Sequence, residues 1–268
     1  MQTLTISIGQ YIPGKSIFHR ADPRTKILWT FTMMVLILIV NNIWGYILSS
    51  VFVFGSLAVS KIPPKMIVNS LKPMAFFIVF TVFFNLLFFQ GDELILKLGF
   101  VKIYLEGIIF SAKMIVRIIL LVSSATLLTF TTTSVNITDG LESLMRPLEK
   151  IKVPVHDIAM MMSIALRFIP TFAEETDKIM KAQASRGADF ETGNIFTRIK
   201  SYVPLLVPLV VGAFKRAEDM ATAMESRCYR GGEGRTKFRV LTFGKSDLVI
   251  LIGTVLFTAA IILLNVFL

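Results

Sequence analysis

The sequence predicts an all-α integral membrane protein with about five transmembrane helices and a cytoplasmic module of long amphipathic helices. Of the 268 residues, 54% are hydrophobic and only 17% are charged, whereas about a quarter of the residues in a soluble domain are charged. The mean hydropathy is +0.70. Apolar runs long enough to cross a bilayer recur along the chain, as expected of a multi-pass helical protein.

The first two spans form a hairpin. Residues 1–26 are polar and rich in turn residues, and an apolar block then runs from Ile27 to Val59 with Asn41-Asn42 at its centre. One span needs about 20 residues. A block of this length with a central polar pair therefore predicts two short spans joined by a tight turn.

Two more spans follow, at Met74–Phe89 and Leu105–Phe130. Between them, Gln90–Lys102 is predicted to be a linker with at most a short amphipathic piece. The fourth span contains Lys113 and Arg117, which are four positions apart and share one helix face. Such side chains either snorkel to the interface or face the interior of a bundle.

The distribution of charged and apolar residues changes after Thr131. Between Thr131 and Lys245 charged residues occur every few positions, helical periodicity persists, and no run is cleanly apolar over the length of a full span. We predict long amphipathic helices against the cytoplasmic face, and then a charge-free span from Leu248 to Leu268. The chain is thus divided into four parts. Residues 1–26 form a cytoplasmic segment and residues 27–130 form transmembrane helices 1–4. Residues 131–245 form a cytoplasmic module of coupling helices, and residues 246–268 form the C-terminal transmembrane helix.

The topology follows from the basic residues in short loops, which stay in the cytoplasm. The N-terminal segment and the loop around Lys61 and Lys65 are basic, so we place the N-terminus in the cytoplasm and the C-terminus outside. The net charge of +10 fits cytoplasmic loops, and we expect no nucleic-acid partner.

One motif is rejected. Gly9 to Ser16 matches the phosphate-binding pattern G-x-x-x-x-G-K-[ST]. Such a loop must lead directly into a helix whose N-terminus faces the anion. Here Asp22-Pro23 interrupts the chain shortly afterwards, so nucleotide binding is not expected and the segment is predicted to be a turn on the membrane face.

No other pattern indicates catalysis or a metal site. The single cysteine is Cys228, and the two histidines are far apart without ligand spacing. We therefore expect no enzyme activity, no metal and no cofactor. Arg167 lies between apolar neighbours and is either a snorkelling side chain or part of an ion pair at a helix crossing, with Glu174 or Glu175 as its partner.

Two segments of the charged module end alike. Ala184-Ser185-Arg186-Gly187 closes one amphipathic stretch, and Glu225-Ser226-Arg227-Cys228 closes the next one along the chain. When the two arginines are aligned, Asp177 also aligns with Glu218, and Ala182 aligns with Ala223.

Three interpretations of the paired arginines remain open. The first is an ordinary helix C-terminus, where a cation favours the macrodipole and Gly187 supplies a left-handed cap. This explains Arg227 less well, because Cys228 follows it. The second is a site for an anionic ligand or headgroup. The third is docking, in which each guanidinium pairs bidentately with an acidic groove on a partner.

The chain resembles the transmembrane coupling (T) component of energy-coupling factor transporters, a class of prokaryotic ABC importers for vitamins and metal ions. The resemblance covers nearly the whole chain. It rests on four motifs in the same order, namely Gly9-Gln-Tyr-Ile-Pro-Gly14 with His19-Arg20-Ala-Asp22-Pro23-Arg24-Thr-Lys26, Ile158 to Pro170, Ser185-Arg186-Gly187, and Ser226-Arg227-Cys228-Tyr229-Arg230-Gly231. Cys228 departs from the glycine that the family's second arginine motif would have.

The resemblance implies a non-enzymatic coupling subunit in the prokaryotic cell membrane. Its partners would be a dimer of two ABC ATPases, which use the ATP, and a membrane-embedded substrate-binding S component. The site implied for the ATPases is Ala184, Ser185, Arg186, Gly187, Ser226, Arg227 and Cys228, on coupling helices in the cytoplasmic module. The alternatives are a stand-alone carrier or channel, which would need a polar path through the spans, and a membrane-bound lipid enzyme, whose paired acidic or histidine clusters are missing from the sequence.

Overall fold

The computed structural model describes residues 11–88, 94–98, 101–188, 190, 194–231 and 240–267. Two compact units can be recognised. The bundle unit comprises the described residues of Gly9–Ser143 and Val240–Leu268, and the two-helix unit comprises those of Leu144–Arg239. Each unit is described by itself.

The bundle unit begins with a short helix α1 (Ile17–Arg20) and the predicted hairpin of α2 (Pro23–Ile39) and α3 (Ile43–Val59). Asp22 caps α2 by accepting a hydrogen bond from the Arg24 backbone at 2.9 Å, and Pro23 occupies the first turn, where a missing N–H costs nothing. The break between the two helices lies at the predicted asparagine pair.

A second pair of helices, α4 (Pro64–Phe88) and α5 (Leu105–Thr131), packs side by side. The predicted linker between them contains a β-hairpin of β1 (Leu94–Leu98) and β2 (Val101–Tyr104), paired antiparallel. The hairpin is an addition to the predicted linker, and its Ile95, Val101, Ile103 and Tyr104 are of types that favour strands. Helix α4 also begins well before Met74 and continues through Pro73.

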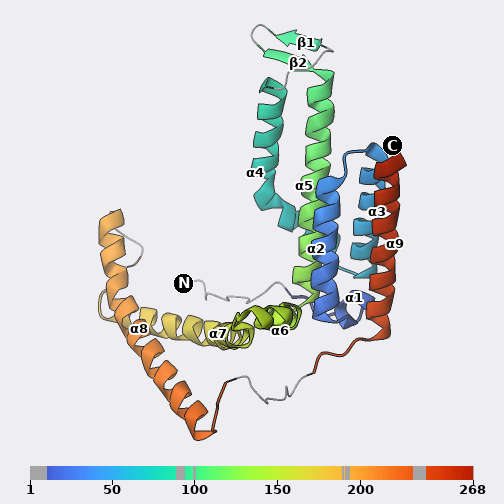
Figure 1. Ribbon diagram of the computed structural model, residues 1–268. Coiled ribbons are helices and arrows are strands. Elements are labelled where there is room, and N and C mark those ends of the chain that lie inside the picture. Colours follow the sequence, from blue (N-terminus) through green and yellow to red (C-terminus); the bar gives the residue numbers. More distant parts are fainter. Residues whose placement is uncertain are drawn as a thin grey trace. The chain divides into compact units, whose positions relative to one another are not determined.

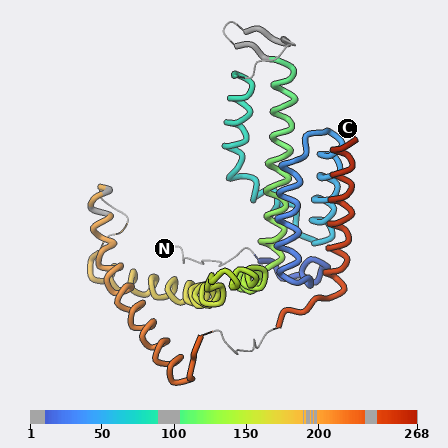
Figure 2. Tube along the Cα trace, in the orientation of Figure 1, coloured from blue at the N-terminus to red at the C-terminus, as the bar shows by residue number. Residues whose placement is uncertain are grey.

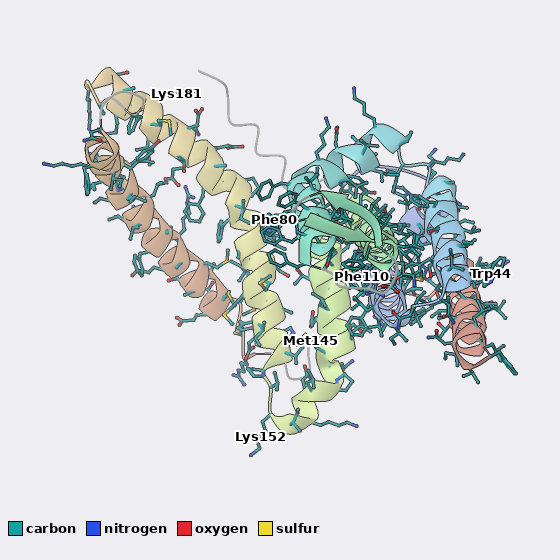
Figure 3. The ribbon with its side chains drawn as sticks, turned by 90° about the horizontal axis from the view of Figure 1, so that it is seen from above. Trp44, Phe80, Phe110, Met145, Lys152 and Lys181 are labelled. Carbon is teal, nitrogen blue, oxygen red and sulfur yellow. The ribbon has the colours of Figure 1, made fainter. Side chains whose placement is uncertain are left out.

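The core of the bundle lies among α2, α3, α5 and α9 (Lys245–Phe267), which run side by side in Figures 1 and 2. Trp29 is 2% exposed. The ring of Phe52 stacks on Phe257 with centroids 4.4 Å apart. By contrast, Trp44 on α3 projects away from the bundle and is 59% exposed (Figure 3).

Helix α4 has no buried residue among those described, and it packs mainly on α5 and β2. Its phenylalanines form a ladder in which Phe80 and Phe84 lie 4.4 Å apart between ring centroids. Several of these rings are largely exposed, Phe76 at 71% and Phe88 at 73%. An apolar surface of this kind must be covered by lipid or by another membrane protein.

Helix α6 (Ser134–Met145) follows α5. The two-helix unit then consists of a 3-10 helix η1 (Arg146–Ile151), α7 (Val155–Ser185) and α8 (Ile195–Ser226), with α7 packed against α8. Lys152, in a left-handed conformation at the turn between η1 and α7, is labelled in Figure 3. Three prolines, Pro170, Pro204 and Pro208, lie inside these long helices.

The predicted fold class is confirmed, with the β-hairpin as an addition. Four described helices have the length and composition to cross a membrane, namely α4, α5, α7 and α9. Helices α2 and α3 have 17 residues each, near the lower limit for a span. Although α7 meets these requirements, its mean hydropathy is the lowest of the four, and its assignment to a cytoplasmic module stays a prediction.

Candidate docking site at two helix ends

Helix α7 ends in a compact hydrogen-bonded cap. The backbone N–H of Ala188 donates to the carbonyl of Gln183 at 3.0 Å, and the N–H of Gly187 donates to Ala184 at 3.0 Å. Gly187 has a φ of +88°, which is the left-handed conformation that glycine adopts readily. This is the Schellman closure, in which the last helical carbonyls find backbone partners.

Helix α8 ends with the same pattern of bonds. The N–H of Tyr229 donates to Met224 at 3.0 Å, and the N–H of Cys228 donates to Glu225 at 2.9 Å. Cys228 has a φ of +56°, so a cysteine occupies the left-handed position that Gly187 fills on α7. The helix-end interpretation therefore explains Arg227 as well as Arg186, contrary to our expectation that Cys228 makes it fit less well.

The serine before each arginine turns its hydroxyl back onto its own helix. Ser185 donates to the carbonyl of Lys181 at 3.1 Å, and Ser226 donates to the carbonyl of Ala223 at 3.0 Å. These hydroxyls satisfy backbone carbonyls near the helix end. The two tips are consequently closed at the backbone level.

The arginine side chains themselves are free. Arg186 and Arg227 are exposed, and neither has a hydrogen-bond or ion-pair partner within the part of the chain that the structure describes. Lys181, just over one turn before Arg186, pairs instead with Asp177. Each helix therefore presents one unpaired guanidinium at a rigid end.

The two tips lie at opposite ends of the helix pair. The hydroxyl of Tyr229, which follows Arg227 closely, contacts the sulfur of Met160 at 3.0 Å. Met160 lies near the start of α7, whereas Arg186 directly follows its last residue. At about 1.5 Å of rise per residue, the two arginines are separated by roughly 39 Å along α7.

An ion pair does hold the two helices together, but with a different arginine from the one predicted. Arg216 of α8 lies 2.6 Å from the Glu175 carboxylate, and its guanidinium lies 5.2 Å from the centre of the Phe172 ring. A methyl group added at Gly212 would come within 3.3 Å of Glu175, so the small residue admits the carboxylate. Sequence reasoning missed Arg216 because its partner lies on another helix.

Arg167 is not part of this ion pair. Its side chain is exposed, as is that of Glu174. Helix α7 continues unbroken through Pro170, so Glu174 and Glu175 lie about two turns from Arg167, roughly 11 Å along the axis, and the carboxylate of Glu175 pairs with Arg216. The snorkelling or surface interpretation of Arg167 is the one that fits.

A buried polar cluster joins three helices of the bundle unit and explains the motif from His19 to Lys26. Asp247, 2% exposed, accepts hydrogen bonds from the backbone N–H of Asp22 and of Gly244, both at 2.7 Å. Lys26, also 2% exposed, donates to the carbonyl of Thr131 at 2.9 Å and to the hydroxyl of Thr132 at 3.2 Å. The lysine thus caps the carbonyl end of α5, where a cation is favoured.

Arg117, like Lys26, donates hydrogen bonds to a helix end, here the C-terminal end of α2. It donates to the carbonyl of Val40 at 2.8 Å and to the side chain of Asn41 at 3.3 Å. Of the two alternatives left by the sequence, the interior of the bundle is therefore the correct one for Arg117. The asparagine pair that interrupts the first apolar block is held by an arginine of the fourth span.

The N-terminal motif does not form a nucleotide site in the described residues. Ser16 caps the four-residue helix α1 and bonds to His19, so no long helix follows the loop. Gly9 and Gln10 lie outside the described residues. Between residues 11 and 267, as far as described, no three His, Cys, Asp or Glu side chains gather in a way that could hold a metal.

The fold and the two helix ends define a multi-pass helical membrane protein that carries a charged helix pair with two exposed cationic tips. The profile of the CbiQ family, described as "Cobalt transport protein", matches residues 14–238. Similar proteins include the energy-coupling factor transporter transmembrane protein EcfT of Ruminiclostridium cellulolyticum, 51% identical over 97% of both chains. The EcfT of Bacillus subtilis is 45% identical over 96% of this chain and 97% of its own. The chain belongs to this family, and it is the transmembrane component of an energy-coupling factor transporter.

Proposed function

We propose that this chain transmits ATP-driven motion from a dimer of two cytoplasmic ABC ATPases to a membrane-embedded S component that binds a vitamin or a metal ion. The chain itself hydrolyses no ATP. The observation that carries the proposal is the pair of matching helix ends, each closed at the backbone and each presenting an exposed arginine without a partner within the described chain.

The geometry of the tips supports docking over a shared ligand site. Arginines roughly 39 Å apart cannot hold one small anion between them, but they suit a partner with two separate acidic grooves. A guanidinium fork pairs bidentately with a carboxylate. A charge pair of this kind that is desolvated in an interface is worth about 2–5 kcal/mol when one side is removed.

In this proposal the S component, and not this chain, binds the transported substrate. The printed description of the matching family names cobalt, whereas the relatives' names give no cargo. Because the S component would provide recognition, both cargo classes remain compatible with the same coupling subunit.

The docking proposal is tested by reversing both tip charges. Arg186→Glu with Arg227→Glu should abolish co-purification of the ATPases in mild detergent while membrane insertion and yield stay normal. The matched control is Lys178→Glu with Lys215→Glu, which makes the same charge change at exposed positions on the same two helices and should leave co-purification intact. Normal ATPase recovery with the tip variant would disprove docking through the arginines.

The orientation is part of the proposal as well. The basic residues around the bundle end that contains α1 favour a cytoplasmic N-terminus, and the helix pair would then face the ATPases. A stand-alone carrier is disfavoured, because Arg117, one of the two charges within a predicted span, is engaged with the α2–α3 turn and does not line a free polar path.

A further inference from the structure

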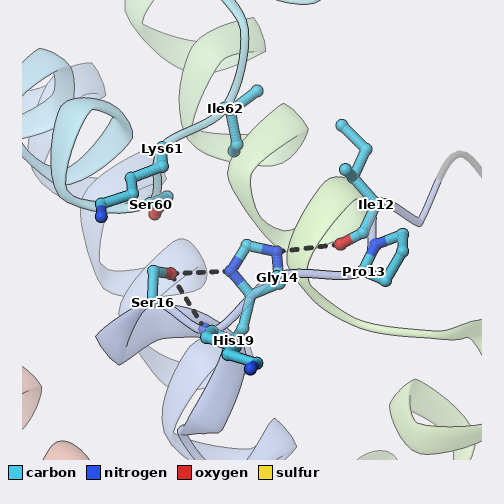
Figure 4. Close-up of a pocket in the computed structure, with 9 residues that line it drawn as sticks. Ile12, Pro13, Gly14, Ser16, His19, Ser60, Lys61 and Ile62 are labelled. Carbon is cyan, nitrogen blue, oxygen red and sulfur yellow. Dashed lines mark hydrogen bonds between the residues drawn. The ribbon is translucent and has the colours of Figure 1, made fainter.

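A pocket of about 270 Å³ opens where α1 begins and α3 ends (Figure 4). One wall comes from Ile12 to Ser16 and His19, and the other comes from Ser60 to Ile62. Its volume is just under the roughly 300–1,000 Å³ of sites that enclose a whole drug-sized molecule. The pocket therefore suits one part of a larger ligand.

The charges around the pocket all have one sign. Lys15 and Lys61 are exposed, neither has a partner among the described residues, and none of the nine described lining residues is acidic. Lys61 also adopts a left-handed conformation with a φ of +55°, which is unfavourable for a residue with a side chain. Two uncompensated ammonium groups beside a hollow attract an anion.

His19 supplies hydrogen bonds but no charge. The carbonyl of Ile12 can only accept, so the Nε2–H of His19 donates to it at 2.9 Å, and Nδ1 then accepts from the Ser16 hydroxyl at 2.7 Å. Burial lowers the pKa of His19 below its usual value near 6.5, partly opposed by the bond to Ile12 and reinforced by Lys26. At neutral pH the attraction for an anion therefore depends on the two lysines.

Apart from Gly14 and Ser60, the remaining lining is apolar and lies at the end of the transmembrane bundle. Ile12 and Pro13 lie on one side, and Ile62, which is 7% exposed, lies on the other. A free anion gains nothing from such groups, whereas a phospholipid presents a glycerol backbone beside its phosphate. Basic pockets at this level of a membrane protein bind anionic headgroups.

We propose that the pocket between α1 and the end of α3 binds the phosphodiester of an anionic phospholipid, with Lys15 and Lys61 as its cationic ligands. This site is independent of the helix ends and of the ATPase partners. Each lysine near an anionic lipid surface contributes roughly 1 kcal/mol, so loss of both should weaken binding about 30-fold.

The test titrates the full-length chain in neutral detergent with short-chain phosphatidylglycerol and counts bound lipid by native mass spectrometry. Lys15→Gln with Lys61→Gln should weaken binding about 30-fold. Lys65→Gln with Lys72→Gln should behave as the parent, because it removes the same charge at exposed positions of α4 outside the pocket. Lys15→Arg with Lys61→Arg keeps both charges and should retain binding, which attributes a loss in the Gln variant to the missing positive charge.

Two competition measurements distinguish a phospholipid headgroup from a free phosphate as the ligand. Glycerol phosphate and inorganic phosphate, each offered alone, should displace the lipid only at far higher concentration. Displacement by inorganic phosphate at the concentration of the lipid would overturn the lipid assignment. Equal lipid binding by the Lys15/Lys61 and Lys65/Lys72 Gln variants would overturn the site itself.

Discussion

Replacing Asp247 with alanine should destabilise the bundle unit more than any exposed substitution. The carboxylate accepts two backbone hydrogen bonds at 2.7 Å, from Asp22 and Gly244, and it is 2% exposed. Hydrogen bonds to a charged group contribute about 1.5–3 kcal/mol each. Removing one side of a buried charged cluster costs about 3–5 kcal/mol, so we expect a loss of about 3–5 kcal/mol.

The second half of the prediction concerns Lys26. With Asp247 absent, the buried ammonium keeps its bonds to Thr131 and Thr132 but loses a compensating negative charge. Lys26→Met retains most of the stem and removes the charge. In the double variant, Lys26→Met with Asp247→Ala, the loss should be smaller than the sum of the single losses by about 0.5–3 kcal/mol, the range found for residues in one network.

The measurement is thermal unfolding in detergent, followed by the fluorescence of Trp29. The chain has two tryptophans, and Trp44→Phe leaves the buried Trp29 as the only reporter. Asp247→Asn is the matched control, since it keeps one acceptor oxygen and should lose less than the alanine variant. An Asp247→Ala variant within about 0.5 kcal/mol of the parent, or strictly additive losses, would refute the proposed network.

Three further predictions concern single residues. Cys228→Gly should stabilise the end of α8 by up to about 1 kcal/mol in chemical denaturation, because glycine accepts the left-handed conformation more readily; a less stable variant would contradict the cap. If α7 and α8 lie in the cytoplasm, a membrane-impermeant maleimide should label the exposed Cys228 in inside-out vesicles and not in intact cells, and the reverse pattern would place this end outside. The pKa of His19 is lowered in the folded state. As the pH drops below about 6.5, the imidazole therefore takes up a proton more readily in the unfolded chain than in the folded one, and folding stability should fall. His19→Gln should flatten that part of the melting-temperature profile, and an unchanged profile would show that His19 does not report on folding.

The positions of the apolar helices along the chain could be predicted because each depends on a local signal. Length and apolar composition identify α4, α5 and α9, and the Asn41-Asn42 pair correctly separates α2 from α3. The position of Arg186 at a helix end was also a local inference, and the Schellman bonds after Gln183 confirm it.

What the sequence could not provide are contacts between distant residues. Asp22 and Asp247 are separated by 225 positions, and Glu175 finds Arg216 across a helix pair. No periodicity encodes such partners, and for this reason the sequence indicates Arg167 as a candidate partner and not Arg216. Four prolines, Pro73, Pro170, Pro204 and Pro208, lie inside long helices, because the packing and the remaining backbone bonds of a long helix outweigh one lost N–H.

The unbroken length of α7 has a mechanical consequence. Thirty-one residues form a rod of about 46 Å, half as long again as the hydrocarbon core of a bilayer, which is about 30 Å thick. Pivoting such a rod by about 5° around its arginine tip carries the far end through about 4 Å. If the proposed ATPase binds at Arg186, a rotation of a few degrees there would displace the other end of α7, beside η1, by several Å.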